Sequence, residues 1–302
     1  MFNDTKKKNI LVTHNGKFHA DDILACAVLQ LILEKRGEDY EVIRTRDTKI
    51  IAEADYVFDV GGEYDAEKNR YDHHQLGGAG KYDSDIPYAS IGLVWKHFGE
   101  ELCGSEKIAG MIEDQIVMPI DADDNGVALV DLKSDVAPFR LQEYFYAFRP
   151  TWREGSTDEV FDAGFHKCVD LAKELFLRQI KIKQDYDGVA ELFKKDYDCA
   201  EDKRIIELSE AYPWEGVSTE YPDTLFTVYP RQDNWRLGTV RKERYSFANR
   251  KDLPAVWAGL RDVDLQAVSG IDDAIFCHNG RFLAVAKTRE GALALAKLAV
   301  DN

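Results

Sequence analysis

The segment "NILVTHNGKFHADDILACAVLQLILEKRG", residues 9–37, decides the fold of this chain. Its first six residues form a short apolar run that ends in polar residues, which predicts a strand. From residue 21 onward the apolar side chains follow the i, i+3, i+4, i+7 spacing of one helix face, at Leu24, Ala27, Val28 and Leu31. Gly37 suits the end of that helix. The segment therefore predicts a strand, a tight loop and a helix.

The sequence around this segment continues the same alternation. Further strands are predicted over 40–45 and 56–62, and helices over 90–104 and 106–126, the last of which ends in an acidic turn. Alternating strands and helices predict an α/β fold in which a mostly parallel sheet carries helices on both faces. In such sheets, ligand sites collect at the carboxyl ends of the strands.

The chain is long enough for more than one domain. We expect a metal-binding catalytic domain over 1–155, a long helical linker over 156–198 and a smaller α+β domain over 199–302. Residues 157–197 contain no proline and few turn residues, which favours helix. Short strand-like runs and a final helical run follow it. The third region is expected to cap the substrate, with a cleft between it and the first domain.

The composition is that of a globular protein with an acidic balance. Of 302 residues, 45% are hydrophobic and 31% are charged, and the formal net charge is −16. This charge argues against a protein that coats nucleic acid by bulk electrostatics, but not against a nuclease, because bound cations reverse the sign locally. The five cysteines are scattered without a CxxC pair, which disfavours a disulfide framework or a cysteine zinc site. We expect a cytoplasmic protein without a membrane partner, because no apolar run reaches roughly 18 residues.

The stretch "THNGKFHADD", residues 13–22, places His14, His19 and Asp21 in the loop between the first strand and the helix. Such a loop can fold several side chains around one point, and a helix N-terminus favours anions such as phosphate. The pattern indicates a metal or phosphate site. The alternative is that Asp21 or Asp22 only caps the helix.

Three further stretches bring acids and histidines together. They are Asp59 in "FDVGG", Asp72, His73 and His74 in "RYDHHQ", and Asp121, Asp123 and Asp124 in "PIDADDNGV". Imidazoles and carboxylates together suit Mn²⁺, Co²⁺ or Zn²⁺ better than Mg²⁺. With residues 13–22 these stretches supply about six ligands, more than one tetrahedral ion needs, and predict a two-metal site. Taken singly, each could be a turn aspartate, a solvated polar loop or a solvated acidic turn.

The order H-x4-H-x-D, "DVGG", "DHHQ" and "IDADDNG" resembles the DHH phosphoesterase superfamily. More narrowly, "THNGKFHADD", "YASIGLVWKHFG", "RPTW", "LPAVWAGLRD" and "TREGALALA" are similar to the melanocyte-proliferating-gene protein family, described as metal-dependent hydrolases and RNA exonucleases. The similarity covers nearly the whole chain and does not depend on one short motif. It implies a DHH-like first domain and a hydrolase that acts on phosphate ester bonds.

The resemblance also implies residue roles. The metal ligands would be His14, His19, Asp21, Asp59, His73 and one aspartate of the acidic turn, with Asp121 favoured and Asp124 as the alternative. Of these, His14 and His19 would hold one cation, Asp21 the other, and Asp59 would bridge the two. The catalytic residues would be Asp59, His74, which faces the substrate phosphate, and Asp72, which orients the histidine pair.

Substrate contacts are expected in both halves of the chain. The candidates are His74, Ser90, Arg241, Arg244, His278 and Arg281. The segment 231–251, "RQDNWRLGTVRKERYSFANRK", has seven basic residues against two acids, with aromatics between them. This pattern suits single-stranded nucleic acid; the alternative is a solvated strand pair with packed aromatics.

The chain departs from the resemblance at two places. The superfamily has an aspartate at the position of His19, so the site here is shifted toward nitrogen ligands and away from Mg²⁺. The family's glycine pair near the C-terminus is replaced by Ala284 and Val285, which removes part of a backbone cradle for phosphate.

The residues and the resemblance together imply a two-metal phosphodiesterase, acting as a 3′→5′ exonuclease on single-stranded RNA or short oligonucleotides. Two divalent cations are expected, Mn²⁺ first, with Mg²⁺, Co²⁺ and Zn²⁺ as alternatives. The alternatives to this function are a hydrolase of a small phosphate compound, such as pyrophosphate or a cyclic dinucleotide, and a non-catalytic regulator that binds metal or nucleotide.

Overall fold

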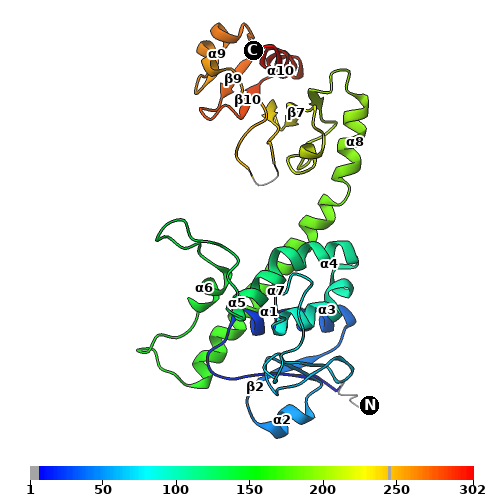
Figure 1. Ribbon diagram of the computed structural model, residues 1–302, viewed down its shortest axis with the longest axis vertical. Coiled ribbons are helices and arrows are strands. Elements are labelled where there is room, and N and C mark those ends of the chain that lie inside the picture. Colours follow the sequence, from blue (N-terminus) through cyan, green and yellow to red (C-terminus); the bar gives the residue numbers. More distant parts are fainter. Residues whose placement is uncertain (1–6, 244–245) are drawn as a thin grey trace, which may run out of the picture. The chain divides into compact units, whose positions relative to one another are not determined.

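The computed structural model describes residues 7–243 and 246–302. The chain divides into an N-terminal unit, residues 1–184, and a C-terminal unit, residues 185–302 (Figure 1). This border lies near the end of α7, Asp158–Tyr186, which is followed by α8, Val189–Cys199. No helix in the described part of the chain is long and apolar enough to cross a membrane.

The N-terminal unit is built on a five-stranded sheet with the order β2-β1-β3-β5-β4. Its strands are β1 Asn9–Thr13, β2 Tyr40–Arg44, β3 Tyr56–Phe58, β4 Tyr64–Asp65 and β5 Arg70–Tyr71. β1 pairs in parallel with β2 and β3, and β3 pairs in parallel with β5, whereas β4 is antiparallel to β5 at the edge. The predicted α/β fold with a mostly parallel sheet is confirmed.

Helices cover both faces of this sheet. Apart from α7, the helical elements of the unit are α1 Ala20–Arg36, α2 Thr48–Glu53, the 3-10 turn η1 Ala66–Lys68, α3 Ser90–Cys103, α4 Glu106–Ile112, the π-helical turn η2 Glu113–Val117, α5 Met118–Asp124 and α6 Leu141–Tyr146. Leu11 and Phe58 share one core with α1 and α3, whereas Val12 and Val57 pack on the opposite face against Ile51 of α2. In Figure 1, α1 and α3 lie above the sheet and α2 lies below it.

Helix α1 forms the centre of the unit. Every residue from Ala20 to Leu33 is buried, because apolar side chains surround the helix on all sides. Burying each leucine or isoleucine side chain stabilises the fold by about 1.5–3 kcal/mol. The helix ends at Gly37, whose φ of 68° lies in the left-handed region that glycine adopts without strain. The buried core helix therefore holds the loop that precedes it in a fixed place.

The predicted helix over 106–126 is present but is not uniform. Between α4 and α5 the chain makes one π-helical turn, η2, and Pro119 lies in the first turn of α5. The three aspartates expected in an acidic turn lie within the last turns of α5 instead. A π turn contains extra residues and so rotates all later side chains around the helix axis. This rotation decides which aspartate faces the neighbouring strands.

The C-terminal unit is a smaller α+β structure. Its sheet has the order β6-β7-β8-β10-β9, in which only the β6–β7 pair is parallel. The elements that follow α8 are β6 Ile205–Glu207, η3 Val217–Glu220, β7 Phe226–Arg231, β8 Asn234–Thr239, η4 Ala255–Trp257, α9 Asp262–Ser269, β9 Ala274–Cys277, β10 Leu283–Ala286 and α10 Arg289–Asp301. Leu295 and Ala299 of α10 belong to the core of this unit, together with Phe226 and Leu237 of the sheet.

Candidate metal centre

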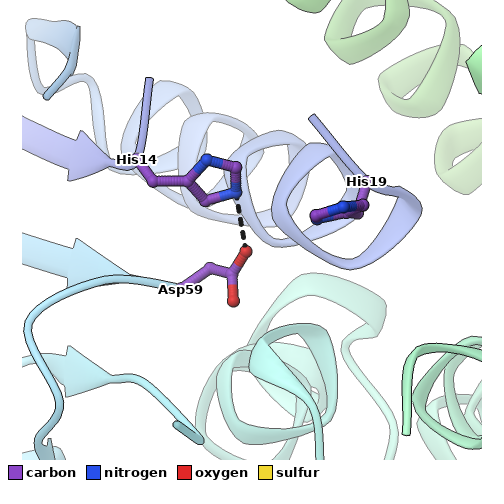
Figure 2. Close-up of side chains that lie close together, drawn as sticks. All are labelled: His14, His19 and Asp59. Carbon is purple, nitrogen blue, oxygen red and sulfur yellow. Dashed lines mark ion pairs between the residues drawn. The ribbon is translucent and has the colours of Figure 1, made fainter. Parts of the chain in front are cut away.

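Three neighbouring strands of the N-terminal sheet end at one place. His14 follows β1, Asp59 follows β3, and Asp72 follows β5. The sheet order reverses at β1, because β2 lies on one side of it and β3 on the other. Ligands of such sheets bind outside the carboxyl ends at the reversal. Figure 2 shows His14 and Asp59 close together, with His19 at the start of α1 beside them.

One ring nitrogen of His14 faces the backbone of the next residue, and the other faces Asp22 and Asp59. Its Nδ1 lies 3.0 Å from the carbonyl oxygen of Asn15, so Nδ1 carries the proton and Nε2 keeps a lone pair. Nε2 lies 3.1 Å from Oδ2 of Asp59 and 3.3 Å from Oδ2 of Asp22. Burial opposes protonation of His14, but the hydrogen bond to Asp59 and the charges of both acids raise its pKa. A lone pair and two carboxylates converge on one point, which a proton or a metal cation can occupy.

His73 makes the second such contact. Its Nε2 lies 3.3 Å from Oδ1 of Asp59, 3.4 Å from Oδ2 of Asp124 and 3.9 Å from Oδ2 of Asp21. This buried nitrogen has no hydrogen-bond partner among the described residues. Asp59 therefore presents one carboxylate oxygen to His14 and the other to His73.

Four aspartates surround these histidines, and their pKa values show the cost of bringing them together. Burial, followed by the charges of Asp59 and Asp124, raises the pKa of Asp21 well above its usual range. Burial raises the pKa of Asp22 to about 7, and burial with the charge of Asp59 raises that of Asp124. Burial acts the same way on Asp59, but its close contacts with His14 and His73 and their charges outweigh burial and lower its pKa. The cluster as a whole favours bound positive charge.

Buried polar atoms without a hydrogen-bond partner are rare in folded proteins. Within the described residues, five such atoms gather here: Asp21 Oδ1 and Oδ2, Asp22 Oδ2, Asp59 Oδ1 and His73 Nε2. Three groups of side chains have ligand atoms within 4.8 Å of one another: His14, His19 and Asp59; Asp59, His73 and His74; and His19, Asp21 and Asp124. Carboxylate oxygens and imidazole nitrogens in this arrangement fit divalent cations.

Asp72 organises the "DHH" stretch through four hydrogen bonds. Its Oδ1 accepts from the backbone N–H of His73 at 2.8 Å, from that of His74 at 3.2 Å and from Nδ1 of His74 at 2.7 Å. Its Oδ2 accepts from the N–H of Gly62 at 2.5 Å, which ties "DHH" to "DVGG". The hydrogen bond to Asp72 raises the pKa of His74 to about 9, and 61% of the His74 side chain is exposed. His73 thus points into the cluster while His74 meets solvent.

Asp121, the favoured ligand of the acidic turn, makes hydrogen bonds to neighbouring residues, and its role as a ligand stays a prediction. Its carboxylate is fully buried, accepts the Tyr82 hydroxyl at 2.7 Å and accepts the N–H of Gly92 at 3.0 Å. Asp121 therefore fastens α5 to α3. Asp124, the alternative, lies one turn later in α5, and its Oδ2 faces His73.

Ser90, which was expected to contact substrate, also has a partner within the protein, and its role stays a prediction. Its buried hydroxyl donates to the carbonyl oxygen of Tyr71 at 2.6 Å, at the start of α3, and so links the helix to β5.

The remaining substrate candidates lie in the C-terminal unit or outside the described residues. The Arg241 guanidinium lies 5.0 Å from the centre of the Phe247 ring. Nδ1 of His278 accepts the N–H of Gly280 at 2.9 Å, and Arg281 pairs with Asp252 at 2.6 Å. Arg244 lies outside the described residues. The Ala284 side chain is buried in the core of this unit.

Three residues of the centre were not expected as functional. Asp22 caps α1 by accepting the N–H of His19 at 2.9 Å, and its other oxygen faces His14. Arg44 donates to the carbonyl oxygen of Gly16 at 2.9 Å, and Arg149 donates through Nε to that of Phe18 at 2.8 Å. The two arginines hold the histidine loop from different segments. Of these three residues, only Asp22 could be suspected from the sequence, because it lies next to Asp21. The contacts of Arg44 and Arg149 join distant segments and leave no pattern in a single sequence.

Comparisons with known proteins agree with this picture. A family model matches residues 10–300 and is described as "Uncharacterised protein family (UPF0160)", with the name MYG1_exonuc. The protein named MYG1 exonuclease of Homo sapiens is 35% identical over 94% of this chain and 84% of its own length. The MYG1 exonuclease of Bos taurus is 35% identical over 94% of this chain and 83% of its own length. The MYG1 protein of Dictyostelium discoideum is 30% identical over 95% of this chain and 94% of its own length.

A search of solved structures gave a much weaker likeness. RecJ of Thermus thermophilus, in complex with Mn²⁺, is 14% identical with a TM-score of 0.29, over 98% of this chain and 52% of that chain. A likeness this low supports no inference. The family match covers nearly all of the sequence and confirms the family resemblance found there. The chain belongs to the MYG1 exonuclease family, the family described as UPF0160.

Proposed function

We propose that the chain is a metal-dependent phosphodiesterase that uses two divalent cations and shortens single-stranded RNA or short oligonucleotides from the 3′ end. The observation that carries the proposal is the shared carboxylate of Asp59, which lies 3.1 Å from Nε2 of His14 and 3.3 Å from Nε2 of His73. Relatives named exonucleases support a nucleic acid as the substrate. The direction of cleavage and the preference for RNA follow from the family resemblance.

The ligand atoms divide into two sets that share Asp59. His14 and His19 would hold one cation with Asp59; Asp21, His73 and Asp124 would hold the other. When bound, such a pair supplies a water of lowered pKa and neutralises charge on phosphoryl oxygens. The mixture of imidazoles and carboxylates favours Mn²⁺, with Co²⁺ and Zn²⁺ as further candidates and Mg²⁺ as the least suited.

His74 would contact the phosphate itself. Its Nδ1 is held by Asp72 at 2.7 Å, so the ring is oriented and Nε2 is left for a partner outside the protein. A histidine N–H can donate a hydrogen bond to a phosphoryl oxygen or a proton to the departing oxygen. The burial of Asp72 and its four hydrogen bonds make it the residue that positions His74.

We propose that the C-terminal unit, residues 185–302, contributes substrate contacts through the turn between β9 and β10. The His278 ring lies 4.2 Å from the Phe282 ring, measured between centroids. Arg281 has a φ of 57°, in the left-handed region that costs a non-glycine residue about 1–2 kcal/mol. Strain of this kind persists where a side chain must point in a particular direction. Arg281→Ala should raise KM for an oligonucleotide and leave the turnover of a generic phosphodiester unchanged.

The proposed function is tested with protein stripped of metal by a chelator and reloaded in turn with Mn²⁺, Co²⁺, Zn²⁺ and Mg²⁺. Single-stranded RNA labelled at its 5′ end should give a ladder of labelled products that shorten step by step, fastest with Mn²⁺. The same RNA in a duplex is the control. Cleavage confined to pyrophosphate or cyclic dinucleotides would instead identify a small-phosphate hydrolase. Bound metal without turnover of any phosphate ester would identify a regulator.

A further inference from the structure

The stretch "YFYAFRPTWR", residues 144–153, has a composition that the metal centre does not explain. It contains five aromatic residues, two arginines and no acid, in a chain whose formal net charge is −16. It begins in α6 and continues into the connection to α7. Figure 1 shows this connection projecting from the N-terminal unit as a green loop. We call residues 144–153 the aromatic strip.

The near end of the aromatic strip touches the metal centre. The Tyr146 ring lies 6.3 Å from the His19 ring, edge to face. The Arg149 guanidinium lies 3.4 Å from the centre of the Tyr146 ring, and its Nε donates to the carbonyl oxygen of Phe18. A base or phosphate placed against Tyr146 and Arg149 would therefore be next to a proposed metal ligand.

The far end of the strip lies in solvent. The Trp152 side chain is 83% exposed, and the Arg153 guanidinium lies 4.6 Å from its ring centre. Trp95, Trp214 and Trp257, by contrast, are buried. Packing gives no reason for this tryptophan to be at the surface. Trp152 is three residues from Arg149, so their Cα atoms are at most about 11 Å apart. Up to about three stacked nucleotides, at 3.4 Å each, can span such a distance.

Aromatic rings with arginines beside them are how proteins bind single-stranded nucleic acid without reading its sequence. Bases stack on the rings, and the cations contact phosphates and the ring faces. The aromatic strip has no acidic residue, and a polyanionic ligand explains this because acids would repel it. A protein partner would not explain it.

We propose that the aromatic strip is a binding track for single-stranded nucleic acid, on which Trp152 stacks a base within about three nucleotides of the one against Arg149. This inference rests on the proposed function, because it takes the substrate of that centre as its ligand. It places a substrate track in the N-terminal unit, apart from the basic and aromatic segment 231–251.

The test compares two exposed aromatic residues that each carry an arginine. Trp152 has Arg153 beside it, and Phe247, 90% exposed in the C-terminal unit, has Arg241 at 5.0 Å. Binding of a fluorescein-labelled ten-nucleotide RNA is measured by anisotropy with the full-length protein in chelator, so that no cleavage occurs. Trp152→Ala should weaken binding at least fivefold, the lower end of what one stacked base contributes. Trp152→Phe should bind within twofold of the unchanged protein, and Phe247→Ala should lose less affinity than Trp152→Ala.

A second measurement separates this inference from the proposed function. Hydrolysis of bis(p-nitrophenyl) phosphate with Mn²⁺ needs the metal centre but not the strip, so kcat of Trp152→Ala should equal that of the unchanged protein. Unchanged RNA binding by Trp152→Ala, with hydrolysis intact, would overturn the track and leave the phosphodiesterase standing. A loss of binding in Phe247→Ala alone would also overturn it. Absence of hydrolysis by the unchanged protein with every metal would overturn the proposed function, whereas a binding loss specific to Trp152→Ala would still support the track.

Discussion

Helix α5 carries two aspartates with different contacts, the buried Asp121 and the partly exposed Asp124, and their asparagine variants give the sharpest test of the metal centre. Asp121 accepts hydrogen bonds from Tyr82 and Gly92, whereas Asp124 faces His73 across 3.4 Å. Asparagine has nearly the same shape as aspartate but no charge. Asp124→Asn should therefore remove a metal ligand, and Asp121→Asn should leave metal binding unchanged.

The expected magnitudes follow from these contacts. Even a residue that only supports a metal ligand contributes about 10–100-fold to metal affinity, so Asp124→Asn should weaken Mn²⁺ binding by at least that factor. The same variant should stabilise the metal-free protein, because burial and the charge of Asp59 already raise the pKa of Asp124. In Asp121→Asn, an amide oxygen can accept the N–H of Gly92 and the amide nitrogen can donate to Tyr82. We expect a change below about 1 kcal/mol in the free energy of unfolding near pH 4, where the buried carboxyl of the unchanged protein still holds its proton.

The pH dependence of the Asp121 variant has a definite sign. Burial raises the pKa of Asp121 well above its usual range, so the folded protein holds this proton more tightly than the unfolded chain does. The contribution of this group to stability is therefore fully present below the unfolded pKa of about 3.9 and falls as the pH rises toward the folded value. Asparagine has no proton to lose. The stability of Asp121→Asn relative to the unchanged protein should increase with pH above about 4.

Two assays decide the matter. Mn²⁺ affinity is measured by calorimetric titration of metal-free protein, and stability by urea unfolding between pH 4 and pH 8, each for both variants. Strong loss of Mn²⁺ affinity in Asp121→Asn, with Asp124→Asn unaffected, would refute the assignment of the ligand. Equal losses of Mn²⁺ affinity in the two variants would show that either substitution disturbs α5 as a whole, and that the contacts do not tell the ligand from the structural aspartate.

Three further predictions concern the same unit. Asp59→Asn should abolish metal uptake at both positions, because Asp59 is the ligand that the two positions share. Asp59 has a φ of 53°, which asparagine tolerates better than alanine, so this variant avoids the backbone strain of about 1 kcal/mol that Asp59→Ala adds. If native mass spectrometry still finds two ions, Asp59 is not the shared ligand. Mn²⁺ at 100 times its Kd should stabilise the protein by about 2.7 kcal/mol, which raises the Tm of a unit of this size by roughly 5–11 °C. Calorimetry should show this rise and its reversal by a chelator. An unchanged Tm would argue against a buried cation. Gly92→Ala should destabilise the protein by about 1–3 kcal/mol, since the new Cβ would lie 1.8 Å from Oδ2 of Asp121. Gly110→Ala has open space around its Cβ and should stabilise the protein by about 0.5–1 kcal/mol. Similar urea midpoints for the two variants would contradict the close packing of α3 against Asp121.

Three strands of the sheet, β1, β2 and β3, and a cluster of polar residues at strand ends could be predicted because their signals are local, whereas the two-residue strands β4 and β5 were not predicted. Apolar runs and helical spacing mark the strands and α1, and alternation of the two implies a parallel sheet. The polar residues that end β1, β3 and β5 are His14, Asp59 and Asp72, and the order of a parallel sheet brings those ends together. The family resemblance added the expected roles of these residues. Neither source required any knowledge of contacts across the chain.

The roles of Asp121, Asp124 and Ser90 depend on long-range contacts, which the sequence does not show. Asp121 and Asp124 lie one helical turn apart on α5, and no local signal says which one meets the strands. The π turn before α5 shifts the helix phase, and π turns carry no reliable sequence mark. Ser90 was expected to contact substrate, and in the fold its hydroxyl donates to the carbonyl oxygen of Tyr71. Such partners become visible only once the fold places them.

The metal centre and the fold are energetically linked through the start of α1. Asp21 and Asp22 lie in the first turn of this helix, where the helix dipole favours negative charge by typically 0.3–1 kcal/mol. Yet the pKa values of both acids are raised, so burial and mutual repulsion exceed what the dipole contributes. Arg44 acts in the same direction as the dipole on Asp22, and its side chain is only 1% exposed. Since α1 is also the centre of the core, the repulsion cannot be relieved by moving these acids outward without exposing apolar surface. A cation that relieves it therefore stabilises the whole N-terminal unit, and loss of the cation should loosen the start of α1 before any other helix.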